Sequence, residues 1–299
     1  MAALLSVVFA VLAAASNALA VALQRRAALT VPASEGFRLR LMIDLLHRPV
    51  WLAGFAAVLC AAACQALALA TGPISVVQPI FILELPFALL AAGLILGRRL
   101  GARIWSAVAL VVVGLGTALA AASPTPGTSV PPLALWIPAV LACGGAVALL
   151  VGAALRRPNG PVRAAAVGTA VAVGYALTAA LLKDAAHAGS QGGAAAFFTA
   201  WQTYGFAAVG VGALFLLQNA LHSGPLVASQ PALTLGDASV SLALGVTLFG
   251  ERIRLGWWLV PEILGVALIV TGVVRLAASP LTGSVVAPPS PDAPVVGSP

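Results

Sequence analysis

Two carboxylates, Glu84 and Asp237, stand near the middle of apolar stretches that are long enough to cross a lipid bilayer. The stretches, 72–96 and 224–248, repeat one motif: each opens with Gly-Pro and has Gln-Pro six residues later. A charged side chain in hydrocarbon is costly and is therefore a functional candidate by default. Matching acids in two copies of one unit predict a site for a cation, a polar solute or a proton.

Asp237 belongs to a stripe of polar side chains. Gln230, Thr234, Asp237 and Ser241 follow one another at spacings of four, three and four, which places them on one face of a helix. Oxygen donors around a carboxylate suit a hydrated cation or a polar solute. The alternative is an aspartate that only ties its helix to a neighbour.

Glu84 has apolar neighbours, and Pro86 two residues later frees a backbone carbonyl beside it. Apolar surroundings favour the neutral carboxyl group, which suits an acid that carries a coupling proton. A permanently protonated glutamic acid, bonded to a neighbouring helix, is the alternative. Glu84 and Asp237 are also the two candidate metal ligands.

Other polar groups within apolar stretches are weaker candidates. Glu262 follows Pro261 near the outer end of the last apolar stretch, and Gln78 belongs to the repeated Gln-Pro pair. The amides of Asn17, Gln65 and Gln218 either line a cavity or join helices by hydrogen bonds.

The elements that position these residues are membrane spans. Hydrophobic residues make up 61% of the 299 and charged residues 8%, against about 25% charged in soluble domains. The apolar runs are continuous, so we predict an all-α polytopic membrane protein. The nine expected spans are 2–24, 51–71, 73–96, 104–122, 133–155, 162–185, 194–221, 225–248 and 256–277.

The repeat extends beyond one span. Gln65 returns as Gln218, and Gly97-Arg98-Arg99-Leu100 as Gly250-Glu251-Arg252-Ile253. We predict a first repeat at 1–122, a linker with the fifth span at 123–161, a second repeat at 162–277 and a disordered Pro-rich tail at 278–299. Because the fifth span crosses the membrane between the two four-helix repeats, the second repeat is inverted relative to the first. Inverted repeats are typical of secondary transporters.

Loop charges predict the orientation. With the loop between the first two spans inside, the cytoplasmic side holds most basic residues, which places the N-terminus outside and the C-terminus in the cytoplasm of a bacterial plasma membrane. Lys183, Arg252 and Arg254 fall outside. The basic residues inside are Arg25, Arg26, Arg38, Arg40, Arg48, Arg98, Arg99, Arg103, Arg156, Arg157, Arg163 and Arg275.

Several classes of function are not expected. The net charge of +7 follows from topology, so we expect lipid and a small solute as partners, and no nucleic acid; a homodimer is compatible with the sequence. No motif resembles a P-loop, a hydrolase triad or a cysteine metal cluster, so we expect neither an enzyme nor a cofactor. Glu251 is expected to be a solvated loop charge, and five tryptophans are expected to be interface anchors: Trp51, Trp105, Trp136, Trp257 and Trp258.

Gly250–Ile253 and the Gly-rich run that follows, 264–273, resemble the end of an EamA-type repeat. This repeat defines the drug/metabolite transporter superfamily, whose commonest form has ten helices as two inverted fives. The resemblance implies that form without its first helix. The first copy departs from the pattern, because Arg98 stands where the glutamate would be.

Within that superfamily the chain is most similar to the NIPA-like branch, which is associated with magnesium transport. The similar residues are 51–54, 65–68, 72–80 and 218–221. This resemblance implies a divalent cation such as magnesium as the substrate. The larger superfamily implies instead a small metabolite or drug exchanged for protons. A non-transporting membrane subunit or scaffold is the alternative from another class.

Overall fold

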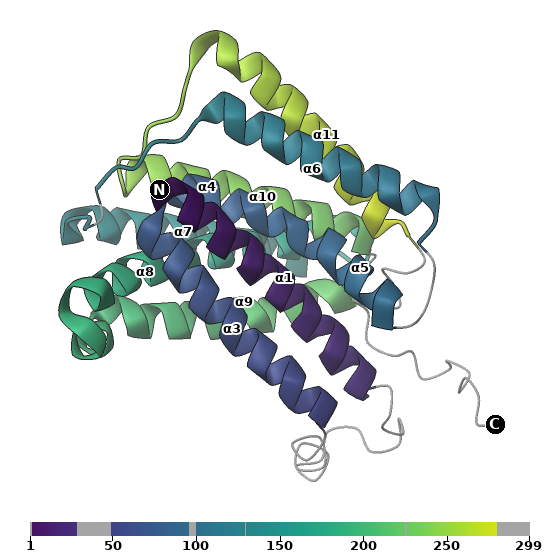
Figure 1. Ribbon diagram of the computed structural model, residues 1–299, viewed down its shortest axis with the longest axis horizontal. Helices are drawn as coiled ribbons and strands as arrows, with labels where there is room; N and C mark the ends of the chain where they lie inside the picture. The colour runs from purple at the N-terminus through teal and green to yellow at the C-terminus, as the bar shows by residue number, and fades with distance from the viewer. Residues whose placement is uncertain (1, 29–48, 96–99, 129, 225, 280–299) are drawn as a thin grey trace.

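The computed structural model describes residues 2–28, 49–95, 100–128, 130–224 and 226–279, which form helices joined by short loops (Figure 1). Residues 280–299 of the predicted tail, the loop at 29–48 and Arg98 lie outside these residues. The helices are α1 (Ala2–Ala28), α3 (Pro49–Thr71), α4 (Ile74–Ile80), η2 (Phe81–Leu83), α5 (Glu84–Ile95), α6 (Ala102–Ala122), α7 (Leu133–Leu155), α8 (Pro161–Thr199), α9 (Trp201–Ser223), α10 (Leu226–Thr247), η3 (Gly256–Trp258) and α11 (Leu259–Ala277).

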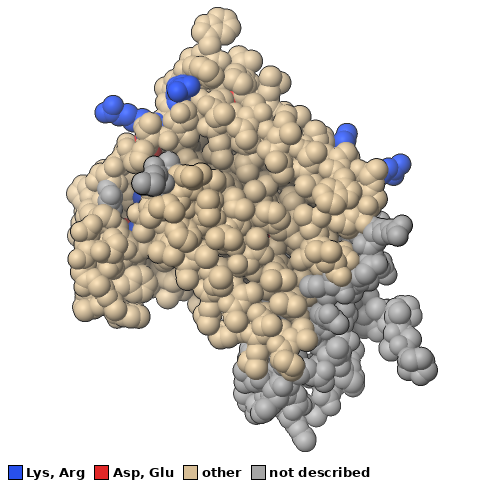
Figure 2. Space-filling view, in the orientation of Figure 1, with Lys and Arg blue, Asp and Glu red and all other residues tan. Residues whose placement is uncertain are grey.

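Within the described residues, seven helical segments are long and apolar enough to cross a membrane, and α9 has a shorter apolar segment over Trp201–Leu217. Exposed leucine, valine and phenylalanine side chains are frequent on these helices. On the face shown in Figure 2, most of the visible Lys and Arg side chains lie at the edge of a broad area without charged side chains. The protein is therefore an all-α polytopic membrane protein, and the number of nine spans stays a prediction.

Proline and glycine set several helix boundaries. Helix α3 ends at Thr71, directly before Gly72-Pro73, and Pro73 precedes α4 in an extended conformation. A proline occurs in the first turn of α8, where its missing N–H has no helical partner in any case. These sequence signals place the helix ends where apolar length alone could not.

The helix pairings have the same form in the two halves of the chain. Helix α1 packs along α3 and against α4 and α5, and α8 packs along α9 and α10. Helices α6 and α11, which correspond to the last predicted span of each repeat, pair with each other (Figure 1). Their backbones approach closely, because a Cβ added at Gly114 would lie 2.6 Å from the carbonyl oxygen of Gly265. Between the halves, α7 packs on α8, and α4 contacts α10.

Two segments differ from the expected spans. The third expected span is divided into α4, the 3-10 turn η2 and α5, and Glu84 begins α5. Pro79 and Pro86 lie on either side of this turn, and a proline cannot donate the usual helical hydrogen bond. Helix α8 continues to Thr199 through a kink at Gly193, where φ is 72°, so α9 begins only at Trp201.

Candidate functional site

The divided third span and α10 meet at Asp237. The Gln78 side chain on α4 donates from Nε2 to Oδ1 of Asp237 at 3.5 Å, and the Ser241 hydroxyl donates to the same oxygen at 3.3 Å. Gln78 is 4% exposed and Ser241 is fully buried. Both hydrogen bonds are long and come from neutral groups, so they hold the carboxylate loosely.

Glu84 lies in the same region of the molecule. Its carboxyl group accepts a hydrogen bond from the Asn17 side chain of α1, and it interacts electrostatically with Asp237. Tyr175 of α8 interacts with both acids. The structure therefore brings together side chains from α1, the α4–α5 segment, α8 and α10.

One atom of the Gln78 side-chain amide has no hydrogen-bond partner among the described residues. Its Nε2 bonds to Asp237, but Oε1 is buried and has no hydrogen-bond partner among the described residues. Buried polar atoms are nearly always paired, because an unpaired one loses its bond to water without replacement. This oxygen can accept a proton-donating group of a ligand or coordinate a cation beside Asp237.

Close helix packing fixes the position of Asp237. A Cβ at Gly236 would lie 2.8 Å from the Cβ of Ala172, so α10 and α8 touch directly beside the acid. Helix α10 is continuous from Leu226 to Thr247. Gly236 thus allows close approach of two helices and does not interrupt its own.

The other predicted residues do not belong to this set of contacts. Thr234 donates to the Gln230 carbonyl of its own helix at 2.8 Å, and Gln65 is half-buried on α3. Glu262 is on α11, where its Oε2 is buried and lacks a partner among the described residues. The side chain of Gln218 lies outside the described residues.

The candidate metal ligands are two carboxylates with one amide oxygen nearby. Among the described residues, no group of three or more His, Cys, Asp or Glu side chains could hold a metal ion. Magnesium usually keeps several water ligands and needs only one or two carboxylates, so the donors present are compatible with a partly hydrated ion.

A second cluster, on the outer side in the predicted orientation, is centred on Glu251. Its carboxylate accepts from Lys183 Nζ at 2.5 Å, from the backbone N–H groups of Ile74 and Ser75 at 2.7 and 3.0 Å, and from the Ser75 hydroxyl. Glu251 is 2% exposed, so the expectation of a solvated loop charge is wrong. The chain turns at Gly250, where φ is 63°, and this turn brings the acid to the start of α4.

Lys183 connects this cluster to α7 and α9. Its ammonium lies 4.5 Å from the ring centre of Phe249, which packs edge-to-face against Trp136. Trp136 Nε1 donates to Asp184 at 3.1 Å, and Gln202 donates to the same oxygen at 2.9 Å. Trp136 is 1% exposed, so it is a core residue and the expected interface role is wrong for it.

One sequence signal could have revealed this cluster. Lys183 is the chain's single lysine, and it stands beside Asp184 in an apolar stretch. A lysine within a membrane-spanning helix needs a charged or polar partner. The search for that partner leads to the acids of the second half, including Glu251.

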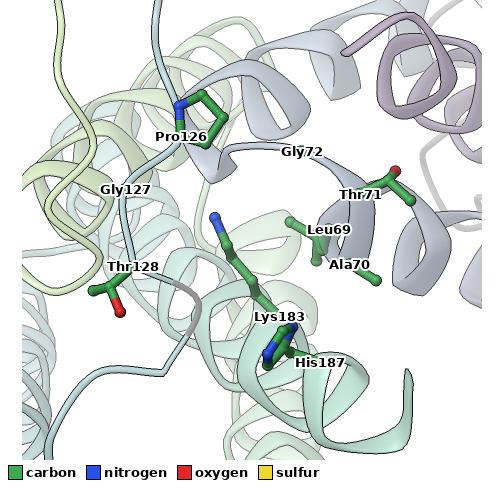
Figure 3. Close-up of a pocket in the computed structure, with 9 residues that line it drawn as sticks. All are labelled: Leu69, Ala70, Thr71, Gly72, Pro126, Gly127, Thr128, Lys183 and His187. Atoms are coloured by element: carbon green, nitrogen blue, oxygen red, sulfur yellow. The ribbon is translucent and has the colours of Figure 1, made fainter. Parts of the chain in front are cut away.

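A cavity of about 90 Å³ lies next to this cluster (Figure 3). Lys183 and His187, one helical turn apart on α8, provide its ionisable side chains. The remaining lining residues are Leu69, Ala70, Thr71, Gly72, Pro126, Gly127 and Thr128.

The chain is similar to an uncharacterized protein of Corynebacterium glutamicum, with 29% identity over 281 residues that cover 92% of this chain and 95% of the relative. No protein-family model matches the chain. No solved structure matches it either. The similarity carries no activity from the relative to this chain.

Proposed function

We propose that this protein is a secondary transporter that works by alternating access. One observation carries the proposal: acids from the two halves of the chain, Glu84 and Asp237, interact in one region, where a buried oxygen of Gln78 has no hydrogen-bond partner among the described residues. Ionisable groups within membrane spans mark substrate or ion pathways, because their cost has to be offset by a function.

The repeat supports this class of protein. The third helices of the two proposed repeats, the α4–α5 segment and α10, contact each other, and sites of inverted-repeat transporters lie at such an interface. Division of a helix at the site is also typical, and η2 divides the α4–α5 segment directly before Glu84. We therefore propose membership of the drug/metabolite transporter superfamily, with an EamA-like repeat and nine spans.

We propose the orientation that the arginines predict, with the N-terminus outside and the C-terminus in the cytoplasm of a bacterial plasma membrane. The loop at 123–132 would then face outward, and its Thr128 is exposed. A cysteine placed at Thr128 should react with an impermeant thiol reagent in intact cells. Reaction only after the membrane is opened would contradict the orientation.

Two substrate classes fit the central site. A divalent cation such as magnesium would bind the two carboxylates and the Gln78 oxygen, as the NIPA-like resemblance implies. Proton-coupled export of a small metabolite is favoured by another observation: the acids are bonded to neutral donors, Asn17, Gln78 and Ser241, and such an environment tolerates gain and loss of a proton.

The test is flux through liposomes that contain only this protein. One arm measures uptake of magnesium with an internal fluorescent indicator. The other measures proton movement with an internal pH dye while a panel of small metabolites is supplied on one side. Flux in either arm above protein-free liposomes supports transport and names the class. The scaffold alternative is favoured if neither arm responds in liposomes whose protein is shown to be folded.

A further inference from the structure

We propose that the outer cavity is a binding site for the carboxylate group of a small organic solute, with Lys183 as its anchor. The inference rests on the proposed transport function and deepens it, because it names the class of solute that such a transporter would bind on its outer side. The site is separate from Asp237 and Glu84, which are absent from the cavity lining.

The charge of the lining favours an anion. Lys183 and His187 line the cavity, and none of the described lining residues is acidic. Figure 3 shows the Lys183 side chain pointing into the space between the segment at Gly72 and the segment at Pro126 and Gly127. A solute in this cavity therefore meets an ammonium group and not the carboxylate paired with it.

The hydrogen bonds of the lining side chains also favour an anionic ligand. The Thr71 hydroxyl donates to the carbonyl of Leu67 at 2.7 Å, and the Thr128 hydroxyl donates to that of Val130 at 3.4 Å. An ammonium has three protons, and Lys183 donates one to Glu251 at 2.5 Å. The side-chain donors left to the cavity are thus the ammonium and the imidazole of His187, which suit the two oxygens of a carboxylate.

Glu251 does not depend on Lys183 alone. Its two oxygens also accept from the backbone of Ile74 and Ser75 and from the Ser75 hydroxyl. The acid therefore stays hydrogen-bonded if the ammonium turns toward a ligand. Asp184 interacts electrostatically with His187, and it accepts hydrogen bonds from Trp136 and Gln202.

The size of the cavity limits how much of a ligand it can hold. A water molecule takes about 30 Å³ in the liquid, so a cavity of about 90 Å³ holds a carboxylate group but not a large organic molecule. A ligand here would share the Lys183 ammonium with Glu251, whose other bonds go to the first turn of α4. The occupied site is thereby coupled to the segment that carries Gln78.

The test uses the full-length protein in detergent micelles with acetate as the probe. Ligand-observed saturation-transfer NMR measures acetate binding at constant ionic strength, with acetamide as the neutral probe of the same shape. Acetate should bind saturably and acetamide should not. Lys183→Met should weaken acetate binding by about tenfold or more, since it removes a charge-assisted hydrogen bond, and Lys183→Arg should retain it.

Arg252→Gln is the matched control, because Arg252 is an exposed basic residue next to Glu251. It should leave acetate binding unchanged. The inference is overturned if acetamide binds as well as acetate, if Lys183→Met has no effect, or if Arg252→Gln weakens binding equally. The comparison of acetate with acetamide remains decisive on the wild-type protein if Lys183→Met fails to fold.

This experiment separates two failures. Acetate binding that depends on Lys183, in a protein without flux in liposomes, would refute the transport function and keep the anion site. Flux in liposomes without acetate binding would refute the anion site and keep the transport function. Displacement of acetate by magnesium chloride, beyond the effect of sodium chloride at equal ionic strength, would overturn the assignment to an organic anion.

Discussion

The site around Asp237 (the central site) and the cluster around Glu251 (the outer cluster, in the predicted orientation) each place an acid against the α4–α5 segment. Asp237 is half-buried and Glu251 is buried, and the two acids are held differently. Asp237 accepts two long bonds, of 3.5 and 3.3 Å, from an amide and a hydroxyl. Glu251 accepts from an ammonium at 2.5 Å and from two backbone N–H groups. The outer acid is saturated with strong donors, and the central acid keeps capacity for a ligand.

This difference separates two uses of a buried charge. A carboxylate with charged and backbone donors joins elements and resists change, because its loss leaves several partners unpaired. A carboxylate with weak neutral donors can exchange them for an ion or a proton at small cost. Substitutions at the outer cluster should therefore alter stability first, and substitutions at the central site should alter transport first.

The largest effect on stability is expected from Glu251→Ala. It removes the partner of Lys183 and exposes the first N–H groups of α4, and removal of one member of a buried ion pair costs about 3–5 kcal/mol. Thermal or denaturant unfolding in detergent measures the loss. Arg252→Ala, at the neighbouring exposed charge, should change stability by no more than about 0.5 kcal/mol. Equal stability of the two variants would mean that Glu251 is solvated.

A smaller effect is expected from Trp136→Phe. The aromatic ring and its edge-to-face contacts with Trp201 and Phe249 are kept, but the hydrogen bond to Asp184 is lost. Asp184 keeps its bond from Gln202, and the loss of one hydrogen bond to a charged group costs about 1.5–3 kcal/mol. Trp257→Phe is the control, because Trp257 is 90% exposed and should change unfolding by no more than about 0.5 kcal/mol. Matching losses in the two variants would contradict the buried role of Trp136.

The contact between the two repeated stretches could be predicted from the sequence. The matching Gly-Pro and Gln-Pro pairs mark equivalent spans, and equivalent spans of an inverted repeat meet near its axis. Gln78, Glu84 and Asp237 were predicted in this way, and Ser241 was predicted from its helical spacing to Asp237. The sequence did not distinguish Asn17 from the other candidate amides, Gln65 and Gln218. Which amide contacts an acid depends on how the helices pair, and the sequence alone does not show this pairing.

The outer cluster could not be predicted by the same means. Glu251 stands in a short loop and is followed by Arg252 and Arg254, which is the pattern of a solvated segment. Its burial depends on contacts with residues 176 and 177 positions away, at the start of α4. Such contacts leave no periodic trace in the sequence. The lone lysine in an apolar helix was the one local sign of them.

Whether the two central acids carry transport is tested most directly by counterflow and proton-driven uptake in liposomes with Asp237→Asn and Glu84→Gln. Asp237→Asn should abolish counterflow, because a neutral amide cannot replace the charge that anchors the solute or ion. Glu84→Gln mimics the protonated acid, so counterflow should persist while proton-driven accumulation is lost. Both variants should fold, since each removes a charge from the membrane interior. Wild-type accumulation by both variants would contradict the role of these acids.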